Sequence, residues 1–392
     1  MRPSDRRFLS VAVSCLLAFL GSLICGLAKT EGSEVTLLKT PNDGIQPQVV
    51  VDSKGVVHLI YFKGKPEAGD LFYVRAKAGQ DDFSEPIRVN SQSGSAIATG
   101  TIRGAQLAIG RDNRVHVAWN GSNAAEPRGP GGTPVLYARS NVKGTDFEPQ
   151  RNLITWAGGI DGGGAIAADR KGNVYVAWHA TAGGKEESER AVYVTRSTNN
   201  GMTFDREKRA NSKPSGACGC CGMRAFIDSK GFLYILYRAA AENTNRDMTL
   251  LVSRDKGATF DSVTLDKWYV GMCPMSSESL AEGGNKILAA WENNSQVYYA
   301  GIEPGTTQFS QLVSAPGSGK NRKHPFVATN AEGQVLFAWT DGTGWAKGGS
   351  LVWQVYDKNR QPTTEKGRIE GVPTWSLLSG FVRPDGSFEL VY

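Results

Sequence analysis

Four of the six cysteines form the group best suited to chemistry. Three lie in the run Cys218-Gly-Cys220-Cys221, and Cys273 follows in a Met-Cys-Pro-Met segment. An exported protein with an even number of cysteines usually forms disulfides, so we expect a bond from Cys273 to the other three. A thiolate site for a soft metal such as Cu(I) and a labile thiol-exchange site are the alternatives. We expect no metal site. If the protein does bind a metal, we expect these four thiols to be its ligands.

Arginines gather at positions where strands are expected to end. Guanidinium groups that converge on one face would hold a carboxylate, sulfate or phosphate through paired hydrogen bonds. The opposing hypothesis is that each arginine pairs with a neighbouring acid inside the protein. The candidate ligand-binding residues are Arg103, Asp161, Arg224, Arg238, Arg246, Glu278, Arg322 and His324. The candidates for stacking on sugar rings are Trp156, Trp268 and Trp345.

The sequence contains no recognisable cofactor motif. The histidines at 58, 116, 179 and 324 lack zinc-type spacing, and the glycine-rich stretch 158–164 lacks the context of a nucleotide-binding loop. We therefore expect no cofactor. The formal net charge of +6 is scattered along the chain and forms no basic stripe, so nucleic acid is not an expected partner.

The amino terminus has the order of a secretory leader. Basic residues precede an apolar run from Phe8 to Leu27, which ends in a small-x-small sequence. We expect residues 1–28 to be a signal peptide and Lys29 to begin a secreted or periplasmic chain. A retained N-terminal anchor is the alternative, because the run is nearly long enough to span a bilayer. No later segment is apolar enough to cross a membrane.

The rest of the chain repeats a unit of two apolar strands joined by a tight polar turn. The first copy runs from Gln48 to Phe62. Further copies occupy 106–119, 165–178, 225–237, 279–291, 326–339 and 377–392. A third and a fourth strand follow each of the first six copies, and the period of roughly 50 to 60 residues is that of a four-stranded propeller blade. With 47 glycines and no long helical period, the sequence predicts one all-β propeller over residues 29–392.

The number of blades depends on how the chain ends meet. Six repeats are complete, and the last copy supplies only the first two strands of another blade. The strand-like segment 34–39 would complete this seventh blade from the other end of the chain. Counting strands therefore predicts seven blades.

The turns between third and fourth strands carry the most specific motif. Ser253-Arg-Asp255-Lys-Gly257-Ala-Thr259-Phe260 follows the pattern S-x-D-x-G-x-T-F at every defined position. In such a turn the aspartate caps the backbone, glycine adopts a positive φ, and the aromatic ring packs between neighbouring strands. These residues are expected to be structural.

A second box has asparagine in place of aspartate, in the sequence Ser197-Thr-Asn199-Asn-Gly201-Met-Thr203-Phe204. Two such boxes in register with the repeat resemble those of the sialidase (BNR/Asp-box) superfamily, over nearly the whole mature chain. The C-x-C-C run with a later Met-Cys-Pro resembles an exported bacterial subset of these proteins. The resemblance implies a propeller, with six blades as in known sialidases, and Asp boxes remote from the ligand.

The resemblance does not carry over a catalytic residue. Sialidases bind the substrate carboxylate with an arginine triad and use a tyrosine nucleophile, assisted by a glutamate, with an aspartate acid/base. The first arginine of the family stands in an (F/Y)-R-I-P motif, where this chain has Gly44-Ile-Gln46-Pro47. The proline is kept and the arginine is missing. Arg238 or Arg246 would have to fill a later position of the triad.

Loop lengths indicate which face of the propeller binds ligands. Tight turns and Asp boxes share one face, which we call the Asp-box face, and the long connections share the other, which we call the long-loop face. The long connections are 90–103, 120–134, 179–190, 211–223, 239–246 and 315–324. We predict that the long-loop face binds a glycan, another anionic ligand or a protein partner. The alternatives are an exo-sialidase-like glycoside hydrolase and a cysteine-based metal-binding or redox propeller.

Overall fold

β-Strands make up nearly all regular structure in the part of the chain described by the computed structural model, residues 35–77, 80 and 82–392. The strands form six four-stranded sheets and one three-stranded sheet. The only helices in that part are three short 3-10 turns, η1 (Pro41–Asp43), η2 (Arg111–Asn113) and η3 (Lys213–Ser215). The proposed leader lies outside the described residues.

Each of the first three sheets is a blade of four consecutive strands. The first blade consists of β2 (Ile45–Val51), β3 (Val57–Lys65), β4 (Ala68–Ala76) and β5 (Ile87–Arg88). The second consists of β6 (Gln106–Ile109), β7 (Val115–Asn120), β8 (Val135–Arg139) and β9 (Arg151–Asn152). The third consists of β10 (Ile160–Ala168), β11 (Val174–Ala180), β12 (Ala191–Ser197) and β13 (Lys208–Arg209).

The next three blades repeat this plan. The fourth consists of β14 (Met223–Ile227), β15 (Leu233–Arg238), β16 (Met248–Ser253) and β17 (Asp261–Asp266). The fifth consists of β18 (Ser279–Gly283), β19 (Lys286–Asn293), β20 (Gln296–Ile302) and β21 (Val313–Ser314). The sixth consists of β22 (Lys323–Thr329), β23 (Val335–Asp341), β24 (Gly349–Tyr356) and β25 (Pro362–Val372).

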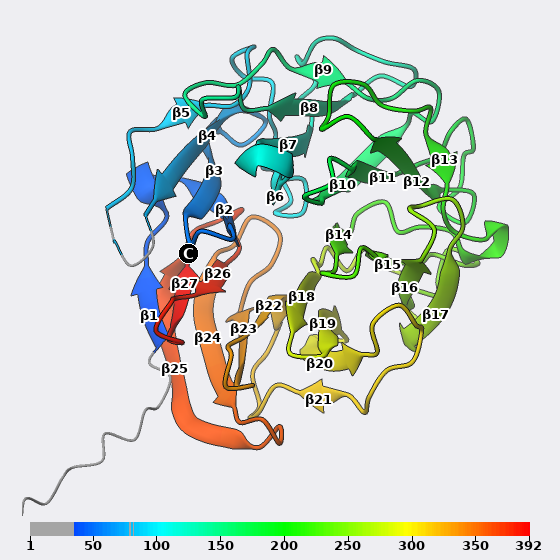
Figure 1. Ribbon diagram of the computed structural model, residues 1–392. Coiled ribbons are helices and arrows are strands. Elements are labelled where there is room, and N and C mark those ends of the chain that lie inside the picture. The colour runs from blue at the N-terminus through cyan, green and yellow to red at the C-terminus, as the bar shows by residue number, and fades with distance from the viewer. Residues whose placement is uncertain (1–34, 78–79, 81) are drawn as a thin grey trace, which may run out of the picture. The chain divides into compact units, whose positions relative to one another are not determined.

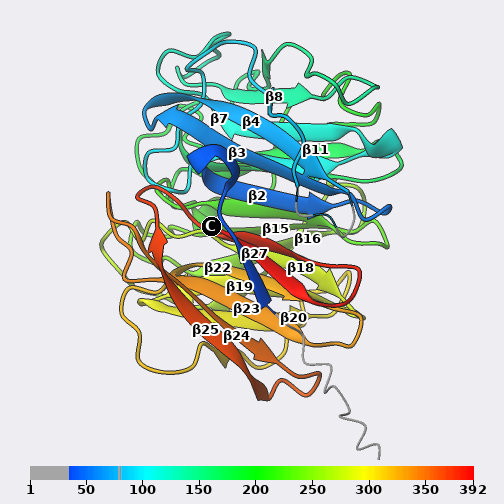
Figure 2. The ribbon, with the colours of Figure 1, turned by 90° about the vertical axis from the view of Figure 1, so that its left-hand side faces the viewer.

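The seventh blade joins the two ends of the described chain. It contains β26 (Ser379–Val382), β27 (Phe388–Val391) and the first strand, β1 (Val35–Leu38). β1 runs parallel to β27, with Val35 opposite Phe388 and Leu38 opposite Val391, and the two strands lie side by side in blue and red (Figure 2). The predicted closure by the chain ends is confirmed, and this blade has three strands.

The innermost strands of successive blades contact one another around a ring. The sequence of contacts runs from β2 through β6, β10, β14, β18 and β22 to β26, and β26 contacts β2 again. Figure 1 shows this succession around a central axis. Seven blades are therefore present, as the strand count predicts. The number six, taken from the resemblance to sialidases, is wrong because the two chain ends build one more sheet.

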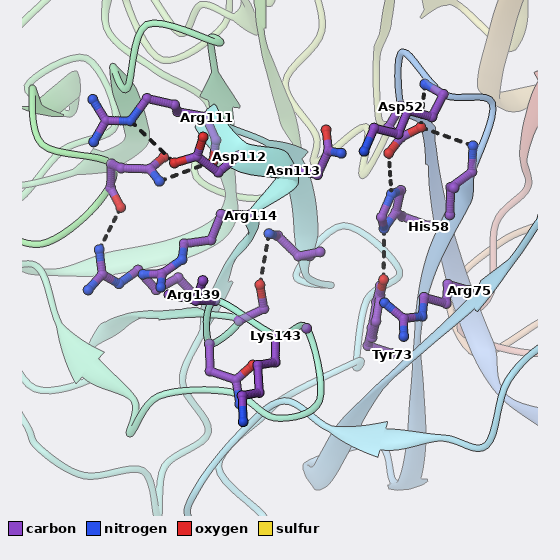
Figure 3. A pocket seen from close by; sticks show the side chains of 18 of the residues that line it. Asp52, His58, Tyr73, Arg75, Arg111, Asp112, Asn113, Arg114, Arg139 and Lys143 are labelled. Atoms are coloured by element: carbon purple, nitrogen blue, oxygen red, sulfur yellow. Dashed lines mark hydrogen bonds and ion pairs between the residues drawn. The ribbon is translucent and has the colours of Figure 1, made fainter.

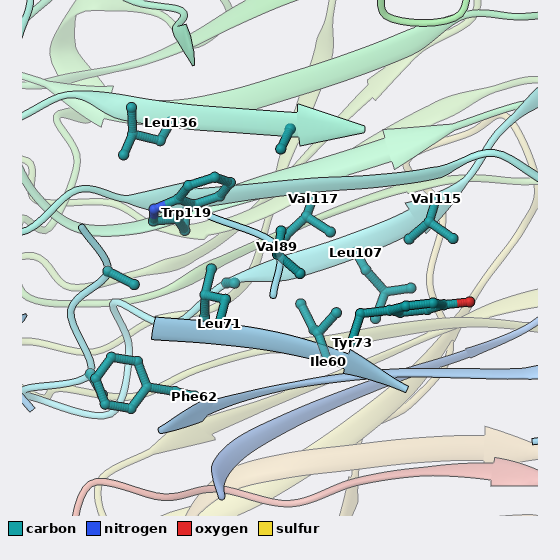
Figure 4. Packing of buried hydrophobic residues seen from close by; sticks show 14 of the residues in the cluster. Ile60, Phe62, Leu71, Tyr73, Val89, Leu107, Val115, Val117, Trp119 and Leu136 are labelled. Atoms are coloured by element: carbon teal, nitrogen blue, oxygen red, sulfur yellow. The ribbon is translucent and has the colours of Figure 1, made fainter. Parts of the chain in front are cut away.

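The second strand of each blade is buried because it has a sheet on either side. Strands such as β7, Val-His-Val-Ala-Trp-Asn, are buried at every position, as expected for a sheet covered on both faces. Four of them carry a tryptophan near the end, namely Trp119, Trp178, Trp291 and Trp339, each no more than 1% exposed. Figure 4 shows one interface, where Ile60 and Leu71 of the first blade face Trp119 and Leu136 of the second.

The Asp boxes fold as the motif predicts. The hydroxyl of Ser253 donates to Asp255 (2.8 Å) and accepts from the amide of Gly257 (2.8 Å), and Asp255 accepts from the amide of Thr259 (2.9 Å). Gly257 has φ +81°, a conformation that disfavours a side chain. Phe260 packs into the core between the third and fourth blades. The box is a structural turn.

The asparagine box keeps the same hydrogen bonds and also joins two blades. Asn199 accepts from the amide of Thr203 (2.9 Å), and the amide of Gly201 donates to Ser197 (2.9 Å). Phe204 packs edge-on against Tyr137 of the preceding blade, with ring centroids 4.9 Å apart.

No helix among the described residues is long and apolar enough to cross a membrane.

The first prediction concerns the exposed carboxylate of Asp255. Hydrogen bonds to Thr259 lower its pKa to about 2, so its contribution is present above its ordinary pKa of 3.8 and is lost as the pH falls towards 2. Asp255→Ala should lower the free energy of unfolding at pH 7 by about 1 kcal/mol, as for the loss of a side-chain cap. Asp255→Asn should cost much less, because Asn199 fills the same position in the other box. Denaturant titrations at pH 7 and pH 2.5 measure both effects. Equal losses for the two variants would contradict the prediction.

Candidate functional site

A small polar cavity lies where the innermost strands open towards the long-loop face. Its volume is about 30 Å³, enough for a water molecule and too small for a sugar. Its polar lining consists of Gln46, Gln48, Thr101, Gln106, Arg224, Ser277, Glu278 and His324. We call this cavity the axial cavity. Below it, a wider space of about 490 Å³ is lined by the innermost strands of all seven blades.

Two equivalent positions of the axial cavity have unusual backbones. Gln46 has φ +54° and His324 has φ +52°, and each precedes a proline where the innermost strand of its blade is irregular. Non-glycine residues in this conformation carry strain that the surrounding structure must offset. Ile45, next to Gln46, occupies the position of the first sialidase arginine. The side-chain amide of Gln46 donates to the carbonyls of Ala98 and Trp375 (both 2.7 Å).

Glu278 is the most perturbed acid of this region. Its side chain is buried at 3% exposure, and neither carboxylate oxygen has a hydrogen-bond partner among the described residues. Burial, reinforced by the nearby Cys221, raises the pKa of Glu278 well above its usual range. Arg224 lies close enough to oppose this shift and donates to Gln48 (2.9 Å). The sequence identified Glu278 and Arg224, and the structure brings both to the axial cavity.

The other predicted arginines are held by the protein itself. Arg103 donates to both the side chain of Asp161 (2.6 Å) and its carbonyl (2.9 Å). Arg322 donates to Gln296 (2.9 Å) and to the carbonyls of Ala315 (3.0 Å) and Pro316 (2.8 Å). These contacts support the hypothesis of internal pairing over that of an open anion site.

Arg238 and Arg246 lie side by side beneath the long loops. Arg238 is 1% exposed, donates to the carbonyl of Arg246 (2.8 Å) and to the hydroxyl of Ser276 (3.2 Å), and lies over the ring of Trp268. Arg246 is 5% exposed and pairs with Glu187. Neither arginine reaches the axial cavity lining, so the structure does not assemble an arginine triad there.

His324 is neutral where a cationic lining was expected. Burial lowers the pKa of His324 to about 3, and its Nδ1 lies 3.0 Å from the hydroxyl of Ser277. Glu292 is buried at 1% exposure, and burial raises its pKa, although Lys323 lies 3.9 Å away.

Three of the four cysteines meet behind the axial cavity. The Sγ atom of Cys218 lies 3.4 Å from that of Cys220 and 3.3 Å from that of Cys221, and all three atoms lie within 4.8 Å of one another. The three side chains are buried, whereas Cys273 is exposed. The structure forms no disulfide among these four cysteines, so the predicted bond from Cys273 is not found. We call the three buried residues the thiol cluster.

Hydrogen bonds of the backbone fix the thiol cluster between neighbouring blades. The amide of Cys218 donates to the carbonyl of Arg238 (2.9 Å), and the imidazole of His179 lies 3.2 Å from the carbonyl of Cys221. Burial alone would raise the pKa of Cys221, but hydrogen bonds from the other two thiols and the charge of Arg238 lower it well below its usual range.

An exposed aromatic pair lies beside the axial cavity. Trp345 is 54% exposed and meets Trp375 edge-on, with ring centroids 4.8 Å apart. A Cβ on Gly100 would lie 3.2 Å from the ring of Trp345 and closer still to Arg103. The carbonyl of Trp375 accepts a hydrogen bond from the side-chain amide of Gln46, so the pair is anchored to the cavity lining.

The other two tryptophans proposed for sugar binding lie elsewhere. Trp156 packs edge-on against Tyr193 (5.2 Å between centroids), under the third blade's outer strands. Trp268 is half-buried beneath Arg238.

Two residues of this region, Trp375 and Gln46, were not among the candidates predicted from the sequence. A signal for Gln46 was present, because Gln46-Pro47 recurs as His324-Pro325 at the same position of another blade.

A second cleft of about 450 Å³ opens on the Asp-box face between the first two blades. Figure 3 shows His58 there, bonded to Tyr73 (2.7 Å) and paired with Asp52 (3.5 Å). Its arginines are partly used in the fold, since Arg114 and Arg139 both pair with Glu148 (3.2 and 2.7 Å). These contacts join strands and turns, and they give the cleft a structural role.

Similar solved structures agree with this architecture. An α-L-arabinanase of Penicillium chrysogenum, solved with arabinobiose, has 12% identity over 84% of this chain and 98% of its own, with a TM-score of 0.53. The Hadza microbial sialidase Hz136 has 12% identity over 83% of this chain and 74% of its own, with a TM-score of 0.51. A Dyadobacter fermentans protein of unknown function has 14% identity over 82% and 97%, with a TM-score of 0.54. The fold is a sialidase-like β-propeller.

At these identities the likeness shows the fold alone. No protein-family model matches the chain, and no curated protein sequence matches it significantly. The sialidase-like propeller therefore supplies a scaffold, and the activity has to be inferred from the side chains of the long-loop face.

The second prediction concerns the buried carboxyl of Glu278. Because its pKa is raised in the folded state, the destabilisation is absent below the ordinary value of 4.5 and grows as the pH rises above it. Glu278→Gln should therefore raise the free energy of unfolding at pH 7 by at least about 1 kcal/mol and have little effect near pH 4. Denaturant titrations at both pH values measure this, with the exposed Glu332→Gln as a matched control. A variant less stable than the parent at pH 7 would show that Glu278 is stabilising as an anion.

Proposed function

We propose that this protein is an exported propeller that binds a carbohydrate chain on its long-loop face. The observation that carries the proposal is the exposed ring of Trp345, held by Trp375 beside the axial cavity. A flat aromatic surface exposed to water binds the apolar face of a sugar ring at little entropic cost when its own position is fixed. The edge-on contact with Trp375 provides this fixation.

The ligand that this face fits is a neutral sugar chain, and not an anionic one. Arg103, which like Trp345 lies against Gly100, is already bonded to Asp161, whose side chain is 42% exposed. An approaching carboxylate or sulfate would have to break this ion pair and would meet the negative charge of Asp161. A sugar hydroxyl, in contrast, can donate to the free oxygen of Asp161 while its ring stacks on Trp345.

The similar structures are consistent with a ligand of this class. One of them is an arabinanase with bound arabinobiose, and another is a sialidase. Binding is favoured over sialidase hydrolysis, because Ile45 stands where the sialidase motif has its first arginine and because Arg238 and Arg246 are used within the protein. An exo-sialidase-like hydrolase is the second candidate, and only the similarity of the fold supports it.

The third prediction tests the sugar-binding surface. Purified mature protein should bind neutral arabino-oligosaccharides in calorimetric titrations more tightly than sialyllactose. Trp345→Ala should weaken this binding by at least about tenfold, as expected for a stacking side chain at the centre of a contact. Trp156→Ala removes an equally large, 38% exposed ring from another part of the surface and should leave binding unchanged. Equal binding by both variants would contradict the proposal, and preference for sialyllactose would favour an anion site.

The fourth prediction concerns catalysis. The protein should not release the fluorophore from a sialoside under conditions in which a bacterial sialidase does, because Ile45 stands where the sialidase motif has its first arginine. Turnover that disappears in Arg246→Ala, while circular dichroism shows an unchanged fold, would instead establish a rearranged sialidase site.

A further inference from the structure

We propose that the thiol cluster is a binding site for one Cu(I) ion. The cluster belongs to the connection between β13 and β14, at the junction of the third and fourth blades. Nothing in the propeller requires three thiols there, since the connections of the other blades are built without them. The site is separate from Trp345 and does not depend on the proposed carbohydrate binding.

The geometry of the three sulfur atoms suits a single soft metal ion. A metal–sulfur bond of about 2.3 Å places three trigonal ligands about 4 Å apart. The observed Sγ separations of 3.3 and 3.4 Å are about 0.7 and 0.6 Å short of this value, and all three atoms lie within 4.8 Å of one another. They are far from the separation of about 2.05 Å in a disulfide. The loop thus presents its three thiols already converged.

The surroundings supply charge of the sign that such a site needs. When Cu(I) binds three thiols, each sulfur loses its proton to solvent, and the complex of three thiolates and one monovalent ion carries two negative charges. Arg238 and Arg246 lie next to the cluster, and both interact electrostatically with Cys218. Arg238, which makes no ion pair with a carboxylate among the described residues, offsets one of these charges, and Arg246, which also pairs with Glu187, offsets part of the other.

The donor set selects copper over zinc. Within the described residues, the only group placed to hold a metal consists of these three cysteines, with no histidine or carboxylate among them. Zn²⁺ normally takes four ligands in a structural site, whereas three thiolates are sufficient for Cu(I). Met275, from the connection between β17 and β18, packs against the cluster, and its thioether is also a soft ligand.

The chain segment that contains Met275 also reaches the surface of the protein. Cys220 is 7% exposed and is the least buried of the three thiols. Met272 is 67% exposed and Cys273 is also exposed, and both precede Met275 in the same segment. The segment thus reaches from the surface to Met275, which packs against the cluster. Cys273 itself is exposed and lies outside the group of three converging sulfur atoms.

The fifth prediction is tested with Cu(I) itself. Reduced mature protein should take one equivalent of Cu(I) from a chromophoric Cu(I) chelator under anaerobic conditions, and excess Zn²⁺ should not displace it. Cys220→Ser should weaken Cu(I) binding by at least about 100-fold, because loss of a direct ligand costs no less than loss of a supporting contact. Cys273→Ser is the matched control and should keep its affinity within a few-fold. X-ray absorption of the loaded parent protein should show sulfur as the only neighbours of copper.

Several results would overturn the proposal. These are failure of the reduced parent to compete with the chelator, unchanged Cu(I) affinity in Cys220→Ser, nitrogen or oxygen neighbours in the absorption spectrum, and displacement of Cu(I) by Zn²⁺. The spectrum is measured on the parent protein, so the test stands even if Cys220→Ser does not fold. Carbohydrate binding is measured separately, and its absence would leave the copper result unaffected.

Discussion

Closure of the ring by β1 and β27 is the constraint on which the rest of the structure depends. Each blade buries both of its faces against neighbours, so an open ring would expose two apolar faces at once. Closing a chain segment over seven blades, compared with one, adds only about 2 kcal/mol of entropy cost, since each doubling of loop length costs about 0.6 kcal/mol. Burial of Phe388, Leu390 and Val391, each 0% exposed, contributes roughly 1.5–3 kcal/mol per side chain. Burial of these side chains therefore more than offsets the entropy cost of closing the ring through the parallel pairing with Val35–Leu38.

A closed ring also decides where chemistry is possible. The innermost strands converge on one axis, and the long connections meet above it, so residues from different blades become neighbours: Gln46 of the first, Arg224 of the fourth, Glu278 before the fifth and His324 of the sixth. Their convergence is tight enough to leave only about 30 Å³. A sugar ring is too large for this cavity, so the carbohydrate chain of the proposed function would lie above it, against the loops, where Trp345 is exposed.

The parts of this structure that could be predicted from the sequence are those that depend on local patterns. The paired strands, the tight turns and both Asp boxes follow from periodicity and turn chemistry, and the seventh blade follows from counting the strands. The fate of the arginines could not be predicted, because a guanidinium at the end of a strand has the same local sequence whether it faces solvent or a carbonyl. Arg322 and Arg238 both bind backbone carbonyls, which no sequence pattern marks. Trp375 was missed for the same reason, since its importance comes from contact with Trp345, thirty residues earlier.

The thiol cluster shows how the spacing of residues in the sequence and their positions in the structure combine in one argument. The spacing of Cys218, Cys220 and Cys221 indicated a special site, but three chemistries remained possible from the sequence. The exposed position of Cys273, away from the buried thiols, disfavours the disulfide, and the convergence of three sulfur atoms supports the proposed metal site. Negative charge on the buried cluster would be stabilised by Arg238, which makes no ion pair with a carboxylate among the described residues, whereas Arg246 already pairs with Glu187. Arg238, which is unavailable to an external anion, is thus placed to stabilise the proposed anionic metal complex within the protein.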